Sequence, residues 1–148
     1  MLSTSSCRCV ADFAILELRE AVNDIELAVL AEESPKTGDA VTKLTGHPVT
    51  QLSDSDLLLK VGADVISAED CNKSWDDINP ITRNMICTKP VLKGSTCNGD
   101  SGGPVILQAT GELVALNLWG YHDCTSEPHP NVASDLPEKL AWIKANSM

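Results

Sequence analysis

The sequence predicts an all-β fold, a barrel of short strands followed by a C-terminal helix. The chain has 148 residues, of which 43% are hydrophobic, so it is long enough and apolar enough to bury the core of one domain. Short apolar segments recur along it between residues that favour turns, and closing such strands into a barrel leaves no exposed edge. The segments expected to form the barrel are Val41–Thr45, Asp56–Ile66, Met85–Thr88, Pro104–Gln108, Leu113–Trp119 and Asn131–Asp135.

Upstream of these strands, the sequence predicts further extended structure and a connector. Phe13–Leu18 is apolar enough for a buried strand, and Ile25–Leu30 is a second candidate. Glu32–Asp39 combines charged residues with a proline and a glycine, which is typical of a turn-rich connector.

Two helices are expected. Ser67 followed by Asp70 matches a capping-box spacing at the start of a short helix, and Asp135 with Glu138 repeats that spacing near the C-terminus. The apolar residues that fall on one face of the C-terminal helix are Leu136, Leu140 and Ile143. This stripe allows the helix to pack against the barrel.

Charge and composition exclude several classes of partner. The net charge of −10 argues against nucleic-acid binding, because phosphates require a cationic surface. No stretch approaches the roughly 20 apolar residues of a membrane helix, and Met1–Ser6 lacks the basic and apolar regions of a signal peptide. We expect no cofactor and no metal, because Cys7 and Cys9 have neither histidine nor further cysteine nearby to complete a zinc site.

The most informative motif is Cys97–Pro104, with the sequence CNGDSGGP. A serine hydroxyl becomes a useful nucleophile only when a base accepts its proton and a rigid backbone aims it. The glycines around Ser101 permit backbone conformations that other residues reach only with strain. The amides of Gly99 and Ser101 can then point together at a developing oxyanion, a contribution of roughly 3–4 kcal/mol per donor.

This motif resembles the nucleophile loop of the chymotrypsin/trypsin family of serine proteases, peptidase family S1, whose members are two packed β-barrels with the active site between them. Other segments resemble that family in the same order along the chain. They are the aspartate strand at Ala11–Leu18, the intermediate helix and its cysteines at Ser67–Cys87, the pocket-lining segment Leu118–Gly120 with Cys124, and the terminal helix at Pro137–Asn146. The resemblance implies a trypsin-like β-barrel at residues 37–148, the second barrel of the fold. Residues 1–36 would be a remnant of the first barrel with the inter-barrel connector.

The resemblance also implies roles for individual residues. Ser101 corresponds to the catalytic nucleophile, and Asp12 to the carboxylate that orients the catalytic histidine. Gly99 and Ser101 would form the oxyanion hole. The residues expected at the specificity pocket are Ser95, Trp119, Gly120 and Asn131.

Six cysteines in a chain of this size favour an oxidising, extracellular compartment. Their spacing leaves the pairing open, and the resemblance implies two disulfides. The implied pairs are Cys71 with Cys87 and Cys97 with Cys124, each expected to stabilise the fold by roughly 3 kcal/mol. Cys7 and Cys9 have no partner in this scheme. Because secretion and the missing signal peptide conflict, we expect the chain to be a fragment that has lost an N-terminal portion.

The catalytic histidine of the family lies upstream of the aspartate strand, and we expect it to be absent because Met1 precedes Asp12 so closely. The histidines present are His47, His122 and His129, and we expect them to be surface residues. The family's activated N-terminal amine, which pairs with the aspartate before the nucleophile, also has no counterpart. Asp100 is therefore expected to point to solvent, with the oxyanion hole collapsed.

The expected pocket departs from the family pattern. Ser95 at its base favours a neutral substrate side chain. Asn131 stands where the family usually has glycine and would fill the pocket, and His47 replaces a packing tryptophan. Leu118 stands where a serine usually bonds the catalytic aspartate. Gly120 is retained, so main-chain pairing with a peptide is still expected.

Three functional hypotheses follow. The first is a serine-type endopeptidase domain that is inactive as this chain because the histidine is absent, its first barrel being missing or supplied by an associating chain. The second is a non-catalytic protease homologue that acts as a binding or inhibitory module. The third is a truncated product without function. In the first two, the expected partner is a peptide or protein, with no nucleic acid and no membrane.

Overall fold

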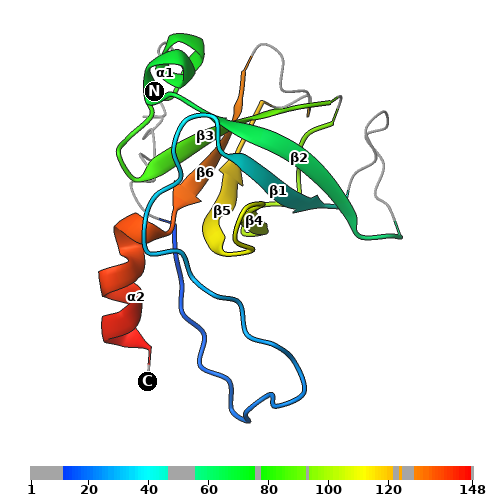
Figure 1. The fold of residues 1–148 in the computed structure, drawn as a ribbon, viewed down its shortest axis with the longest axis vertical. Coiled ribbons are helices and arrows are strands. Elements are labelled where there is room, and N and C mark those ends of the chain that lie inside the picture. The colour runs from blue at the N-terminus through cyan, green and yellow to red at the C-terminus, as the bar shows by residue number, and fades with distance from the viewer. Residues whose placement is uncertain are drawn as a thin grey trace, which may run out of the picture.

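The computed structural model describes residues 12–46, 56–75, 78–92, 94–121, 124 and 129–147. Six antiparallel strands form a closed barrel in the order β1-β2-β3-β6-β5-β4, and β4 pairs with β1 to close it (Figure 1). They are β1 (Ala40–Thr45), β2 (Leu59–Ile66), β3 (Met85–Pro90), β4 (Pro104–Leu107), β5 (Leu113–Trp119) and β6 (Asn131–Asp135). The all-β prediction is confirmed, and every expected barrel segment contains a strand.

The interior of the barrel is filled by small and β-branched side chains. Burial alternates along β1 and β2, as expected for strands with one face toward a core. The buried cluster consists of Ala31, Val41, Ala63, Val65, Ile86, Val105, Val114, Ala115 and Ala133. Such compact residues suit a six-stranded barrel, whose interior leaves little room for large side chains.

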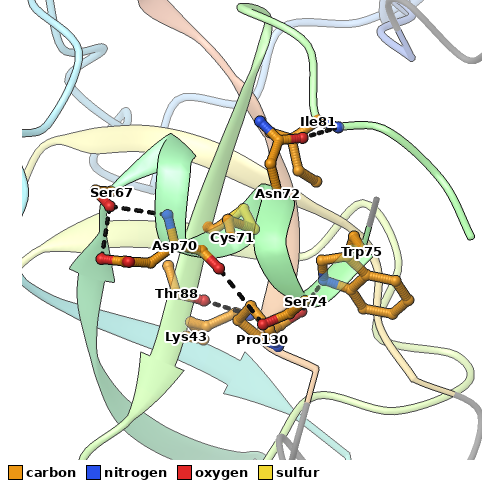
Figure 2. Close-up of a disulfide and its surroundings, with 11 residues drawn as sticks. Lys43, Ser67, Asp70, Cys71, Asn72, Ser74, Trp75, Ile81, Thr88 and Pro130 are labelled. Carbon is orange, nitrogen blue, oxygen red and sulfur yellow. Dashed lines mark hydrogen bonds between the residues drawn. A yellow bond between two sulfur atoms is a disulfide. The ribbon is translucent and has the colours of Figure 1, made fainter. Parts of the chain in front are cut away.

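Helix α1 (Ala68–Trp75) begins with the predicted cap. The Ser67 hydroxyl accepts the Asp70 backbone N–H at 3.0 Å and donates to the Asp70 carboxylate at 2.8 Å (Figure 2). This hydrogen bond from Ser67, reinforced by Lys73, lowers the pKa of Asp70. The cap therefore satisfies one of the amides that a helix N-terminus leaves without a partner.

We expect Ser67→Ala to lower the free energy of unfolding by about 1 kcal/mol, because it removes the cap of α1. Ser74→Ala is the matched control, since this hydroxyl of the same helix makes only a 3.4 Å contact with the Asp70 carbonyl. Urea denaturation measures both variants. Equal stability of the two would show that the Ser67 hydroxyl does not hold the helix start.

Helix α1 is fixed to the barrel at two points. Cys71 forms one of the two expected disulfides with Cys87 of β3. Four residues on, the buried Trp75 indole N–H donates to the Pro130 carbonyl at 3.0 Å, just before β6 (Figure 2). Both anchors lie on the same face of the helix, so α1 covers the barrel beside β3 and β6.

The C-terminal helix comprises a 3₁₀ turn, η1 (Pro137–Lys139), and α2 (Leu140–Asn146). The cap expected from Asp135 is wrong, because the residue at the N-cap is Leu136 and no side chain caps the turn. Asp135 instead ends β6, where it is buried and accepts the Ser34 hydroxyl at 2.7 Å. This burial raises the pKa of its carboxyl. Within the described ranges, no helix is long and apolar enough to cross a bilayer.

Residues 12–29 contain no strand, so the strand expected at Phe13–Leu18 is wrong. This segment runs outside the barrel as an extended loop, drawn in blue (Figure 1). A strand needs a neighbour for its backbone hydrogen bonds, and the closed barrel offers no free edge. The second candidate, Ile25–Leu30, contributes an isolated bridge between Leu30 and Leu113. The division at residue 36 stays a prediction.

Candidate functional site

The loop that carries Ser101 is held against β5 by backbone hydrogen bonds. The Gly102 N–H donates to the Asn117 carbonyl, and the Asn117 N–H donates to the Gly103 carbonyl, both at 2.8 Å. Gly99 has a φ of +95°, in the region that favours glycine, as its position in the motif predicts. The loop is thus a fixed turn that presents Ser101 at its tip.

Asp100 turns inward, and the expectation that it points to solvent is wrong. Its carboxylate accepts the Thr45 hydroxyl at 2.6 Å, the Gly46 N–H at 2.8 Å and the Cys97 N–H at 2.7 Å. These three neutral donors hold the carboxylate in place. The same contacts join the loop that carries Ser101 to the end of β1.

The Ser101 side chain is exposed, and its Oγ donates to the Leu118 carbonyl at a long 3.4 Å. Among the described residues, no acceptor is bonded to the amides of Gly99 or Ser101. These amides are therefore available to a ligand oxygen.

The described part of the chain brings no histidine into hydrogen-bond contact with Ser101. His129 is half-buried rather than at the surface, with its ring 4.6 Å from that of Trp75 and 4.5 Å from that of Tyr121 between centroids. His47 and His122 lie outside the described residues. Asp12 is exposed and forms no hydrogen bond or ion pair with any described residue, so the structure does not bring it to the site.

A pocket of about 150 Å³ opens beside Ser101. It is lined by residues of the loop 96–101, by the end of β5 and the residues after it, 117–121, and by Cys124. The second expected disulfide, between Cys97 and Cys124, forms part of its wall. Trp119 and Gly120, both expected at the pocket, line it.

Ser95 and Asn131, expected at the base, meet beneath this pocket. Both are buried, and the Ser95 hydroxyl donates to Asn131 Oδ1 at 3.0 Å. Asn131 Nδ2 lies only 2.6 Å from the position that a Cβ at Gly120 would take. The asparagine side chain therefore occupies the space directly behind Gly120.

The residue that sequence reasoning missed is Lys43, which is 0% exposed. Its ammonium donates to Thr88 Oγ1 at 3.2 Å, Thr96 Oγ1 at 3.3 Å and Asn131 Oδ1 at 3.4 Å, and Figure 2 shows it beside Thr88. Burial lowers the pKa of Lys43 to about 7, against the opposing effect of the Asp100 charge. Alternation along β1 places Lys43 on the same face as Val41, but the sequence does not show that this face turns inward.

Comparisons with known proteins bear on the family and the fold. The family model described as Trypsin matches residues 3–143. Trypsin 5G1 of Aedes aegypti is 28% identical over 140 residues, which cover 90% of this chain and 52% of that protein. Trypsin-1 of Astacus astacus is 28% identical over 144 residues, which cover 93% and 60%.

A solved structure shows the same likeness. That of neuropsin, a serine protease expressed in the limbic system of mouse brain, superposes with a TM-score of 0.74 at 25% identity over 84% of this chain and 56% of that one. This chain thus spans between half and two thirds of the length of these relatives. It belongs to the trypsin family of serine proteases.

Proposed function

We propose that this chain is the nucleophile-bearing part of a serine endopeptidase domain, in which Ser101 forms an acyl intermediate with a peptide. The observation that carries the proposal is an exposed Ser101 hydroxyl beside two unengaged amides, on a loop fixed by Asn117 and Asp100. A pocket able to take a substrate side chain opens next to it. Nucleophile, oxyanion donors and pocket are three of the parts that acyl transfer requires, and a base is the fourth.

In this proposal, Ser101 Oγ attacks the scissile carbonyl carbon while a base takes the hydroxyl proton. The negative charge that develops on the carbonyl oxygen is held by the N–H groups of Gly99 and Ser101. The C–N bond then breaks, the leaving amine receives the proton, and water hydrolyses the acyl-enzyme by the same steps in reverse. Trp119, Gly120, Ser95 and Asn131 would surround the substrate side chain, and the substrate would be an extracellular peptide or protein.

The base must come from a residue that the structure does not place beside Ser101. We propose a histidine contributed by another part of the complete active site, with Asp12 as the carboxylate that orients it. Loss of the base from such an arrangement lowers turnover on the order of 10⁶-fold. The isolated 148 residues are therefore expected to show no detectable peptide hydrolysis.

A small-molecule base provides the test. We expect p-nitrophenyl acetate with added imidazole to acetylate the whole chain at Ser101, because imidazole accepts the hydroxyl proton and the two amides stabilise the oxyanion. Intact mass and peptide mapping locate the acetyl group. Ser101→Ala should remove it, whereas Ser74→Ala, which alters a half-buried serine of α1, should retain it. Equal labelling of the Ser101→Ala variant would contradict the proposal.

A non-catalytic homologue that binds a peptide is the second candidate. Two observations favour it: Asn131 fills the space behind Gly120, and Asp12 lies exposed without a described partner. This reading predicts that peptides bind to the chain but that Ser101 is not acylated under any base concentration. The acetylation experiment therefore separates the two functions.

A further inference from the structure

Thr96 lines the pocket beside Ser101. Thr96 Oγ1 accepts a hydrogen bond from the Lys43 ammonium at 3.3 Å. An ammonium has donors only, so the Thr96 hydroxyl cannot donate its own proton back to Lys43. No acceptor for that proton exists among the described residues. Thr96 therefore offers an O–H donor to whatever enters the pocket.

The side-chain amide of Asn131 is buried behind the pocket wall. Its Oδ1 accepts from both Lys43, at 3.4 Å, and Ser95, at 3.0 Å, which fixes the orientation of the amide. Its Nδ2 is buried and has no acceptor in the described structure. This nitrogen lies against Gly120, a pocket-lining residue. The Asn131 N–H₂ group therefore directs partial positive charge toward the pocket wall at Gly120 without itself lining the pocket.

The Lys43 ammonium lies behind Thr96 and Asn131 and donates a hydrogen bond to each. Lys43 is fully buried, and within the described ranges no carboxylate lies at ion-pair distance from it. The charged group that acts on it is Asp100, whose carboxylate is occupied by Thr45, Gly46 and Cys97. A buried cation without a directly paired anion favours a ligand that brings a negative charge.

We propose that this pocket selects a short acidic side chain, aspartate, at the substrate position next to the scissile bond, with Thr96 as the hydrogen-bond donor inside the pocket and Lys43, together with the Asn131 amide, as the buried positive charge behind its wall. The small volume and the position of Asn131 behind Gly120 favour aspartate over glutamate and over aromatic residues. This inference rests on the proposed acylation of Ser101. It replaces the preference for a neutral side chain that Ser95 alone suggested.

Peptide thiobenzyl esters test the proposal on the whole chain. With imidazole as base, Ser101 Oγ attacks the thioester carbonyl, the C–S bond breaks, benzyl thiolate leaves, and imidazole takes the hydroxyl proton. Acetyl-Ala-Ala-Xaa thiobenzyl esters with Xaa = Asp, Asn, Glu, Lys or Phe differ only in the side chain offered to the pocket. We expect the Asp ester to acylate Ser101 about tenfold faster than the uncharged Asn ester, because only the former interacts with the ammonium as an ion.

Variants of the chain show which residue causes the preference for the Asp ester. Lys43→Met should bring the Asp/Asn ratio to about one, while Lys60→Met, which changes an exposed lysine of β2, should leave it unchanged. Thr96→Val should slow acylation by the Asp ester, and it tests the pocket hydroxyl independently of the lysine. In the unmodified chain, the Asp/Asn ratio should fall as the pH rises above about 7, the pKa of Lys43.

The outcomes separate this inference from the proposed function. Acetylation of Ser101 by p-nitrophenyl acetate together with equal rates for the Asp and Asn esters would overturn the acidic preference alone. A fastest reaction with the Lys or Phe ester would do the same. An Asp preference that survives Lys43→Met would overturn the counter-charge. No acylation of Ser101 by any ester would overturn the proposed function, and this inference with it.

Discussion

Lys43→Met is expected to raise the free energy of unfolding by about 3 kcal/mol at pH 6. The pKa of Lys43 falls from 10.5 in the unfolded chain to about 7 in the folded barrel. Below pH 7, the folded state must carry the buried ammonium, at a cost of about 5 kcal/mol. Methionine removes this cost but also loses the hydrogen bonds to Thr88, Thr96 and Asn131, so the net gain is smaller.

The sign of the pH dependence follows from proton binding. Between pH 7 and 10.5 the unfolded chain binds a proton at Lys43 that the folded chain does not, so the stability contributed by this group rises with pH. The advantage of Lys43→Met should therefore shrink by about 3 kcal/mol between pH 7 and 9. Urea denaturation of both proteins at pH 6 and pH 9 measures it, with Lys60→Met as the exposed control. An advantage of equal size at both pH values would show that Lys43 is not titrating in the barrel.

The barrel itself was largely predictable, because its strands are encoded locally. Alternation of apolar residues and intervening turns located each strand, and differences were confined to ends, as for β2, which begins at Leu59 rather than at Asp56. Phe13–Leu18 has the same apolar character but forms no strand. Strand formation requires a free neighbouring edge, and that is a property of the assembled sheet rather than of the segment.

Asp135 shows a similar limit to what a short stretch of sequence can predict. Its spacing from Glu138 matches a helix cap, yet the carboxylate is taken by Ser34, 101 residues earlier in the chain. A short sequence window contains no information about such a partner. Ser67 and Asp70, in contrast, form their predicted cap because both partners lie within one turn of α1.

The same distinction holds in the candidate site. The turn around Gly99 is local, so the motif was enough to predict its backbone conformation, while the role of Ser101 stays a proposal. The network beneath the pocket is not local, since it joins Lys43 of β1, Thr96 and Asn131 of β6. Each face of β1 carries one large apolar residue, Val41 or Leu44, so the sequence does not show which face turns inward. A lysine in such a strand is by default expected at the surface.

Asp100 was also misplaced because two of its partners, Thr45 and Gly46, come from the end of β1. The expectation that Asp100 points to solvent took only charged partners into account. Three neutral donors hold the Asp100 carboxylate inward instead, since each carries a partial positive charge directed at it. The conformation of the nucleophile loop therefore depends on β1 as well as on its own sequence.

Asp100→Ala is accordingly expected to lower the free energy of unfolding by about 3 kcal/mol and to abolish acylation of Ser101. The change leaves the Cys97 and Gly46 N–H groups and the Thr45 hydroxyl without their acceptor, and each hydrogen bond to a charged group contributes about 1.5–3 kcal/mol before partial replacement by water. Without this anchor, the turn that carries the Gly99 and Ser101 amides is no longer fixed. Urea denaturation and the p-nitrophenyl acetate assay measure the two effects separately.

Two further variants show which property of Asp100 matters. Asp100→Asn keeps the shape and one acceptor oxygen but places an N–H₂ group against a donor, so we expect a loss intermediate between the wild type and Asp100→Ala. Asp64→Ala removes an exposed carboxylate of β2 with no partner among the described residues, and it should change neither stability nor acylation. If Asp100→Ala retained full acylation of Ser101, the oxyanion site would have to be held by the Asn117 hydrogen bonds alone, and the coupling between β1 and the nucleophile would be refuted.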